Sequence, residues 1–334
     1  MLKVAVLEGE VVGYGASGRN GGFAMTLFGL EPAVTAMLFG KQKTIDAHHY
    51  CERSVDLVRD MVREHNIQSD FEYTGFLRLA TTPGYVKRIQ HDLELLTSLG
   101  VTGIEWIDQA KARAEVNSPL VLGAWSEARC GILNPAKQVR ELKRIAQEAG
   151  AVVYEQSPVT EIRRGAKFTL KTPQGTVTAD KIVFATNAYS HLIPEIWNKQ
   201  VPAFTHMVIT EPLTKGQMDS IGWKNRQGLE DARNLVHYLR LTVDNRLAIG
   251  GSDVTLAYGR DMERDLNEKT FQQLEKDTIE LFPALKDVKF TFRWGGPVSV
   301  TLQMAPAIGM VGSARAWYSV GCVGHGVAPT HLNG

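Results

Sequence analysis

Residues 13–23 read Gly-Tyr-Gly-Ala-Ser-Gly-Arg-Asn-Gly-Gly-Phe, and they come shortly after the nearly all-apolar run Lys3-Val4-Ala5-Val6-Leu7. Glycine has no Cβ, so backbone amides in such a stretch can approach a phosphate group or a flat ring closely. The serine, arginine and asparagine add donors that orient or neutralise an anionic group. The stretch therefore predicts a cradle for a nucleotide, with a flexible loop as the alternative.

The run from Lys3 to Leu7 predicts a strand buried on both faces of a parallel sheet, because nearly all of its residues are apolar. Glu8 ends this strand. In dinucleotide folds, an acidic residue at a strand end accepts hydrogen bonds from the ribose hydroxyls of adenosine. An acidic residue is also ordinary in a solvated loop, so both interpretations of Glu8 stay open at this point.

The composition is that of an ordinary globular protein of 334 residues, with 44% apolar and 22% charged residues. The 37 basic and 36 acidic residues leave a net charge of +1, which gives no electrostatic reason to expect nucleic acid or an anionic membrane as partner. No apolar run is long enough to predict a membrane span. The widely spaced Cys51, Cys130 and Cys322 form no metal-binding pair and suit a reducing compartment, so we expect a cytoplasmic enzyme without a metal.

After the glycine-rich stretch, helical and strand patterns alternate. Asn134-Pro135 predicts an N-cap followed by a first-turn proline, and Gly150 predicts the end of that helix. Strands are expected at 151–154 and 181–185, and a hairpin of 168–172 with 176–179 lies between them. This order is typical of an α/β nucleotide-binding layer with a small β excursion.

The middle of the chain has a different pattern, which predicts a mostly antiparallel sheet. Asp244-Asn245 predicts a turn between two of its strands, and a helix is expected at 262–282. The expected strands cover residues 74–80, 206–210, 235–242 and 247–250.

Together these patterns predict a mixed α/β (in part α+β) fold, in which a Rossmann-like nucleotide-binding domain is interleaved with an antiparallel-sheet substrate domain. A helical connection of residues 31–69 joins the two. The nucleotide-binding domain comprises residues 1–30, 130–190 and 305–334, and the substrate domain comprises residues 70–125 and 191–304.

The eight consecutive residues Gly15-Ala16-Ser17-Gly18-Arg19-Asn20-Gly21-Gly22 resemble the signature of FAD-dependent oxidoreductases of the D-amino-acid-oxidase/sarcosine-oxidase type. Within that family, the resemblance is closest to gamma-glutamylputrescine oxidase-like enzymes. Further similar segments follow in one register over essentially the whole chain, at 157–160, 184–189, 209–213, 238–246, 293–296 and 321–327.

The resemblance implies that FAD is the cofactor. His325 lies between two glycines and just before an expected helix start at 327, where free amides and a partial positive charge would stabilise negative charge on the flavin N1/C2 edge. A loop histidine without a role is the alternative. The implied FAD-binding residues are Glu8, Gly15, Ala16, Ser17, Arg19, Asn20, Gly21, Gly22, Val159, Ala185, Thr186, Gly324, His325, Gly326 and Val327.

Candidate substrate residues come from the expected sheet. Tyr238 and Arg240 alternate with leucines, so both point to one face, where the arginine could clamp a carboxylate and the tyrosine could line a pocket. A solvated face of the sheet explains the same alternation. His206 and Trp294 are further candidates, and an interior histidine and a core tryptophan are the alternatives for them.

By resemblance, the reaction is oxidation of a C–N bond in a small amine or amino acid, by hydride transfer to flavin N5 followed by imine hydrolysis. Oxygen, with release of hydrogen peroxide, or another acceptor would reoxidise the flavin. The family pattern also includes a first βα unit with a glycine loop before Glu8, and we expect this chain to lack it. Two alternatives stay open: an inactive, truncated remnant of such an enzyme, or a flavin dehydrogenase of a hydroxy substrate.

Overall fold

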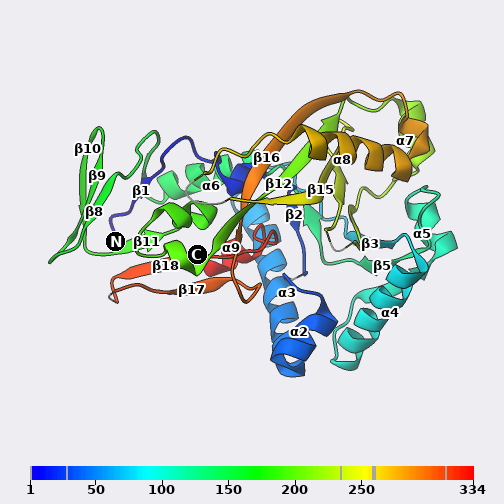
Figure 1. The fold of residues 1–334 in the computed structure, drawn as a ribbon, viewed down its shortest axis with the longest axis horizontal. Helices are drawn as coiled ribbons and strands as arrows, with labels where there is room; N and C mark the ends of the chain where they lie inside the picture. The colour runs from blue at the N-terminus through cyan, green and yellow to red at the C-terminus, as the bar shows by residue number, and fades with distance from the viewer. Residues whose placement is uncertain (1, 28, 234, 258–260, 313) are drawn as a thin grey trace.

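The computed structural model describes residues 2–27, 29–233, 235–257, 261–312 and 314–334, and an eight-stranded sheet dominates its fold (Figure 1). The strand order is β16-β12-β15-β14-β13-β3-β5-β4, and all neighbours are antiparallel except β13 and β3. The expected antiparallel sheet is confirmed. Its strands are β3 (Phe76–Ala80), β4 (Ile104–Asp108), β5 (Gly123–Glu127), β12 (Val201–Thr210), β13 (Gly228–Asp231), β14 (Tyr238–Leu241), β15 (Leu247–Leu256) and β16 (Phe290–Val300).

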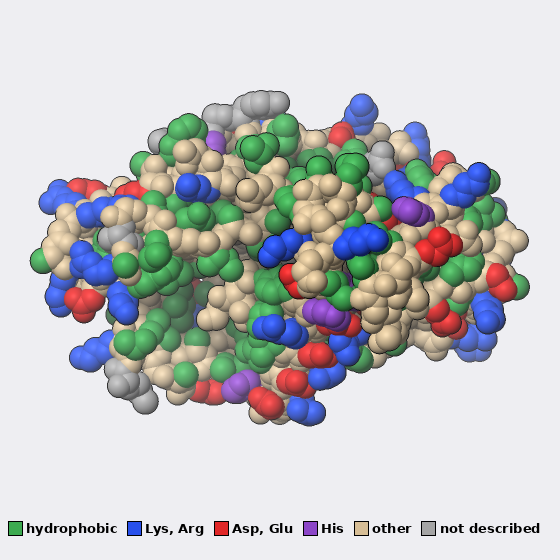
Figure 2. All heavy atoms as spheres, turned by 90° about the horizontal axis from the view of Figure 1, so that it is seen from below, with side chains coloured by type: hydrophobic (Ala, Val, Ile, Leu, Met, Phe, Trp, Pro, Cys, Tyr) green, Lys and Arg blue, Asp and Glu red, His purple; other side chains and the backbone are tan. Residues whose placement is uncertain are grey.

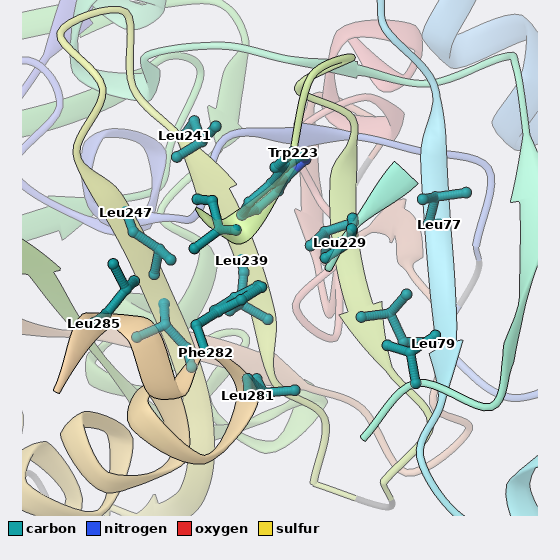
Figure 3. Packing of buried hydrophobic residues seen from close by; sticks show 14 of the residues in the cluster. Leu77, Leu79, Trp223, Leu229, Leu239, Leu241, Leu247, Leu281, Phe282 and Leu285 are labelled. Carbon is teal, nitrogen blue, oxygen red and sulfur yellow. The ribbon is translucent and has the colours of Figure 1, made fainter. Parts of the chain in front are cut away.

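One face of this sheet packs into the largest apolar core of the molecule. Leu239 and Leu241 of β14 point into it and meet side chains from the helices beneath, such as Leu281 and Phe282 (Figure 3). Because side chains alternate along a strand, Tyr238 and Arg240 point to the opposite face. The elements on the core side are α5 (Gln109–Glu115), α7 (Lys215–Ile221), α8 (Glu268–Leu281) and η3 (Pro283–Leu285).

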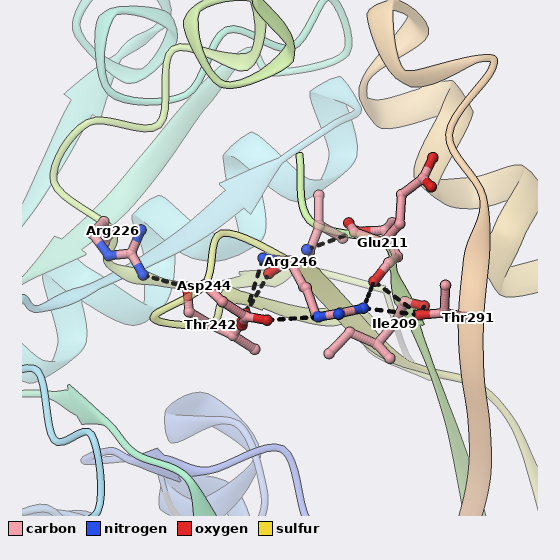
Figure 4. Close-up of polar contacts among 9 residues, drawn as sticks. Ile209, Glu211, Arg226, Thr242, Asp244, Arg246 and Thr291 are labelled. Atoms are coloured by element: carbon pink, nitrogen blue, oxygen red, sulfur yellow. Dashed lines mark hydrogen bonds and ion pairs between the residues drawn. The ribbon is translucent and has the colours of Figure 1, made fainter. Parts of the chain in front are cut away.

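The turn between β14 and β15 lies where the sequence predicts it. Asn245 adopts a left-handed conformation with φ 59°, and Asp244 accepts hydrogen bonds from Thr242 Oγ1 at 2.6 Å and Arg246 Nε at 2.7 Å. Arg246 also reaches the backbone oxygen of Thr210 on β12 at 3.1 Å (Figure 4). The turn is thereby fixed to its neighbouring strands, which sets the register of Tyr238 and Arg240.

The other face of the sheet is covered at one end by three helices and a second core. Phe76 of β3 and Trp125 of β5 lie in this core with Ile89 from α4. α4 begins after Thr82, whose side chain accepts a hydrogen bond from Tyr85 N, and its N1 residue is proline. The helices are α2 (Pro32–Phe39), α3 (Lys41–Glu64) and α4 (Pro83–Ser98).

Four smaller sheets lie at the other end of the molecule or beside the large one (Figure 1). The predicted hairpin and the Asn134 cap are present, since Asn134 Oδ1 accepts from Lys137 N at 3.1 Å at the start of α6. The elements are β1 (Ala5–Leu7) with β7 (Val152–Tyr154), β2 (Phe23–Ala24) with β6 (Gly131–Ile132), β8 (Glu161–Arg163) with β9 (Phe168–Thr172) and β10 (Gly175–Ala179), β11 (Ile182–Phe184) with β18 (Ala316–Val320) and β17 (Ala307–Met310), and α6 (Pro135–Glu148).

One expectation about burial is wrong. The strand that begins the chain is exposed, with Val4 at 47% and Val6 at 42% of their full accessibility, instead of buried on both faces. The physical reason is that β1 pairs only with β7 and no described strand lies on its other edge. Val183 of β11 is likewise 66% exposed, so an all-apolar run identified these strands correctly but not their burial.

The surface mixes charges of both signs, in agreement with a net charge of +1. In Figure 2, basic and acidic side chains are interspersed over the face shown. Among the described residues, no helix is long and apolar enough to cross a membrane, and no three His, Cys, Asp or Glu side chains gather as a metal site would require.

Candidate active site

The glycine-rich stretch folds into a single helical turn, α1 (Ala16–Arg19), followed by an extended segment. Asn20 connects the two parts. Its Nδ2 donates to the backbone oxygens of Ala16 at 2.8 Å and Ser17 at 3.0 Å, while its Oδ1 accepts from Gly22 N at 2.8 Å. A side chain that both donates and accepts is needed here, which explains asparagine at this position.

Two glycines in this stretch leave no room for a side chain. A Cβ on Gly18 would lie 2.1 Å from the backbone oxygen of Gly13, and a Cβ on Gly22 would lie 2.0 Å from that of Leu133. Gly22 also has φ +82°, which favours glycine, and its oxygen accepts from Leu133 N at 2.8 Å. The glycine-rich stretch is therefore closely packed backbone and not a flexible loop.

Arg19 is neutralised inside the protein. Its Nη1 lies 2.7 Å from Asp265 Oδ2 and 3.3 Å from the backbone oxygen of Gly295, and its guanidinium lies 4.4 Å from the ring centre of Tyr14. Trp294 Nε1 donates to the Arg19 backbone oxygen at 2.8 Å. Trp294 thus contacts the glycine-rich segment directly, and Arg19 ties this segment to β16.

The residues expected on the adenosine side lie next to one another. Glu8 N donates to Tyr154 O at 2.9 Å, and Glu8 O accepts from Ser157 N at 2.8 Å, so the chain after β1 runs beside the chain after β7. A Cβ on Gly9 would lie 3.8 Å from Pro158 Cα, in van der Waals contact. Val159, the next residue, is 36% exposed, and Glu8 is partly exposed, so both are accessible to a ligand along this edge.

A third segment meets the glycine-rich stretch after β11. Ala185 and Thr186 are exposed and precede the 3-10 helix η1 (Asn187–Leu192). Tyr189 of that helix packs on Gly15, where an added Cβ would lie 3.3 Å from its ring. Tyr189 therefore places the segment after β11 beside the start of α1.

The segment around His325 forms a compact turn near the end of the chain. His325 N donates to Cys322 O at 2.9 Å, and its Nδ1 lies 3.0 Å from Val323 O. Burial lowers the pKa of His325, which favours the neutral imidazole. Gly324 is exposed, with φ +82° and open space where a side chain would stand. α9 (Pro329–Asn333) begins two residues later than expected.

Tyr238 belongs to a row of side chains that crosses the large sheet. Direct cross-strand partners place it beside Gly250 and Glu230. Its ring fills the space over Gly250 and meets Gly21, where an added Cβ would lie 2.9 Å from the ring. The sheet therefore faces the glycine-rich segment along this row. In strand order the row consists of Trp294, Met207, Gly250, Tyr238, Glu230, Arg78, Trp125 and Trp106.

Arg240 contacts the same segment one step further along β14. Its Nε donates to Gly21 O at 2.6 Å. The carboxylates nearby are already paired, Asp70 with Lys137 at 2.7 Å and Glu72 with Arg226 at 3.1 Å. Burial lowers the pKa of Arg240 to about 10. Among the described residues, none forms an ion pair with this partly buried guanidinium.

His206 does not join the site. It lies on the core side of β12, with its ring edge-on to Phe271 at 5.5 Å between ring centres. Its Nε2 lies 3.1 Å from the backbone oxygen of Arg264, and burial lowers its pKa. The geometry is that of an interior histidine, the alternative considered from the sequence.

A buried charged cluster at the site was missed by the sequence analysis. Arg78 is 3% exposed and pairs through both terminal nitrogens with Glu31, the N-cap residue of α2. Glu230 Oε1 lies 3.5 Å from Arg78 Nη2. Burial raises the pKa of Glu230 to about 7. The sequence contains one sign of this cluster, because Arg78 is the single charged residue in the otherwise apolar strand Phe-Leu-Arg-Leu-Ala.

Comparison with known proteins shows the family to which the chain is similar. The family described as FAD dependent oxidoreductase matches residues 1–334. Gamma-glutamylputrescine oxidoreductase of Escherichia coli is 31% identical over 99% of this chain and 76% of its own length. The probable oxidoreductase OrdL of Haemophilus influenzae is 29% identical over 99% of this chain and 75% of its own length.

Solved structures share the fold. Glycine oxidase from Geobacillus kaustophilus superposes with a TM-score of 0.83 at 19% identity, covering 99% of this chain and 85% of its own. L-proline dehydrogenase from P. horikoshii superposes with a TM-score of 0.79 at 22% identity, covering 98% of this chain and 83% of its own. At these identities the likeness concerns the fold alone.

Proposed function

The chain belongs to the family of FAD-dependent oxidoreductases, and we propose that it oxidises the C–N bond of a small amine or amino acid. One observation carries this proposal: the same glycine-rich segment forms the cofactor cradle and contacts Tyr238, Arg240 and Trp294 of the large sheet. A cofactor and a substrate bound beside these contacts would be adjacent, as the reaction requires.

The residues present fit FAD. Backbone packing at Gly18 and Gly22 excludes side chains, so main-chain groups line the cradle, and the exposed Gly324 has no neighbour where a side chain would stand. Bound there, FAD supplies the hydride acceptor. The FAD-binding residues that we propose are Glu8, Gly15, Ala16, Ser17, Arg19, Asn20, Gly21, Gly22, Val159, Ala185, Thr186, Gly324, His325, Gly326 and Val327.

The domain assignment is part of the same proposal. Residues 1–30, 130–190 and 305–334 form the FAD-binding domain, in which the chain after β1 runs beside the chain after β7 and Tyr189 packs on Gly15. Residues 70–125 and 191–304 form the substrate domain, which contains the large sheet. Residues 31–69 connect the two as α2 and α3.

In this account the protein's own groups orient the substrate. The free terminal nitrogens of Arg240 bind a substrate carboxylate, because a partly buried guanidinium without an ion pair gains most from an anionic partner. Tyr238 forms the wall opposite the cradle, and Trp294 fixes the cradle by its bond to Arg19. The neutral His325 and the amides that follow it place donors at the end of the site.

Oxygen is the electron acceptor that we propose, with hydrogen peroxide as a product, and the cytoplasm is the proposed location. Cys51, Cys130 and Cys322 are all free thiols, which supports a reducing compartment. Oxygen consumption measured with an oxygen electrode, together with peroxide detection, tests the acceptor directly.

The visible spectrum of the purified chain after FAD addition and desalting tests the function. We expect retained flavin bands at roughly 370 and 450 nm, and anaerobic bleaching by an amine or amino acid. Bleaching by a hydroxy acid and by no amine would favour a dehydrogenase of hydroxy substrates. A chain that retains no flavin would favour an inactive remnant.

A further inference from the structure

The row of side chains that faces the glycine-rich segment contains one carboxylate. Glu230 is the direct cross-strand partner of Tyr238 on one side and of Arg78 on the other. Direct partners in a sheet point to the same face with their Cβ atoms about 5 Å apart. Glu230 therefore lies beside Tyr238, on the face of the sheet that meets the cofactor cradle.

This carboxylate is nearly buried yet lacks a hydrogen bond. Glu230 is 4% exposed, none of the described residues donates a hydrogen bond to its side chain, and its ion-pair contact with Arg78 Nη2 is 3.5 Å long. Buried carboxylates in folded proteins almost always accept hydrogen bonds. Glu230 thus retains acceptor capacity that the protein itself does not use.

Arg78 does not meet this need. Its two terminal nitrogens each bind one oxygen of Glu31, at 2.5 Å, so the arginine is already in a two-point ion pair. Its contact with Glu230 is longer and shares one of those nitrogens. Arg78 and Arg88 both act electrostatically on Glu230, but no described residue, Arg78 included, donates a hydrogen bond to its carboxylate.

We propose that Glu230 recognises a cationic nitrogen of the substrate, beside Tyr238 and opposite the cradle. The inference rests on the proposed function and narrows its substrate class to molecules that present an ammonium group to the sheet. Ammonium supplies three donors to an oxygen acceptor that lacks them. Glu230 is then a specificity-determining residue, which discriminates against neutral and anionic analogues.

Protonation of Glu230 would weaken this recognition. Burial is the main cause that raises its pKa to about 7, with Glu31 and Asp231 acting in the same direction and Arg78 and Arg88 in the opposite one. The charged form is therefore lost as the pH falls through neutrality. An alkylamine stays protonated below about pH 10. Because the amine keeps its charge over this range, a loss of amine binding between pH 8 and pH 6 would come from protonation of the protein.

The test compares the FAD-loaded chain with Glu230→Gln and Glu230→Asp, using n-butylamine, n-butanol and butyrate as probes in titration calorimetry. We expect Glu230→Gln to weaken butylamine binding about 30-fold, to leave butanol binding within about twofold, and to remove the pH dependence. Glu230→Asp should retain part of the butylamine affinity, because it keeps the charge.

Glu127→Gln is the matched control. Glu127 is also a buried glutamate of the same sheet, and burial raises its pKa to about 7. Its Oε1 accepts a hydrogen bond from Thr26 and its Oε2 has no partner among the described residues, but it pairs in register with Phe76 and not with Tyr238. We expect this variant to bind butylamine like the unmodified chain. Equal losses in Glu127→Gln and Glu230→Gln would overturn the inference, because they would show a general effect of buried charge.

Two further outcomes separate the inference from the proposed function. Should both Glu230 variants unfold, the probe preference of the unmodified chain decides: tighter binding of butylamine than of butanol supports the role of Glu230, and equal or weaker binding of butylamine contradicts it. If amines bleach the flavin but Glu230→Gln binds butylamine unchanged, the role of Glu230 fails alone. If no amine bleaches the flavin of the unmodified chain, the proposed function fails.

Discussion

The two faces of β14 show how one strand serves both the fold and the site. Leu239 and Leu241 are almost completely buried in the large core, whereas Tyr238 and Arg240 face the glycine-rich segment from the other side. The core face is closed by apolar packing, and its partners are other leucines and aromatic rings. The site face contains the polar side chains of Arg240 and Glu230, which make few hydrogen bonds within the described residues. The difference separates a face that packs the core from a face that we propose to bind the cofactor and substrate.

The largest stability effect should come from the core face. Leu239→Ala should lower the free energy of unfolding by about 3 kcal/mol, because it removes buried methyl groups and leaves a cavity. FAD affinity of the folded fraction should stay unchanged. Urea unfolding measures the first quantity and flavin titration the second. Leu302→Ala is the control, since Leu302 is fully exposed and its loss should cost less than about 0.5 kcal/mol. A drop in FAD affinity in Leu239→Ala would contradict this prediction, because it would show that the core face also determines cofactor binding.

The second prediction concerns a substitution of Arg240, on the face of the sheet that meets the glycine-rich segment. Arg240→Lys should raise the KM for a carboxylate-bearing amine about 10-fold or more, because lysine cannot offer a two-point contact, with little effect on stability. The KM for a simple alkylamine should change less than about twofold. Steady-state kinetics with the two substrate types provide the comparison. Equal increases for both would assign Arg240 to support of Gly21 only.

The smallest predicted effect is a pH dependence of the free energy of unfolding, which comes from a histidine on the core side of the sheet. His237 lies between Asp231 at 3.1 Å and Asp277 at 2.7 Å. Burial lowers its pKa, but the hydrogen bonds to both carboxylates outweigh burial and raise it overall. A raised pKa in the folded state stabilises the protein below the unfolded value of about 6.5, and this contribution is lost as the pH rises through the folded value.

Unfolding at pH 5.5 and pH 8.5 checks this sign. The unmodified chain should lose about 1 kcal/mol more than His237→Gln over that interval. A variant with the same pH dependence as the unmodified chain would show that His237 does not titrate with folding.

The local part of the site could be predicted from the sequence. Gly18, Asn20 and Gly22 act within a few residues of one another, so their spacing carries the geometry. The alternation of Tyr238 and Arg240 predicted a shared face for the same reason. The fold class followed from the order of helical and strand patterns.

The charged cluster of the site could not be predicted, because its residues meet only where distant segments of the chain pair. Glu230 meets Arg78 only because β13 pairs parallel with β3, and Glu31 joins them from the start of a helix on a third segment. No spacing in the sequence encodes that register. The burial of β1 was wrong for a related reason, since an apolar run indicates a strand but does not specify what lies on its edges.

The central claim is that backbone packing at the glycine-rich segment creates the flavin cradle, and FAD titration of the chain beside Gly22→Ala tests it most directly. A Cβ at this position would lie 2.0 Å from Leu133 O, and φ is +82°. Quenching of flavin fluorescence should show tight binding by the unmodified chain and at least about a 30-fold loss in the variant, as expected for strain of a few kcal/mol. Gly175→Ala, with no neighbour in reach, should bind like the unmodified chain. Equal FAD affinity in all three proteins would contradict the account.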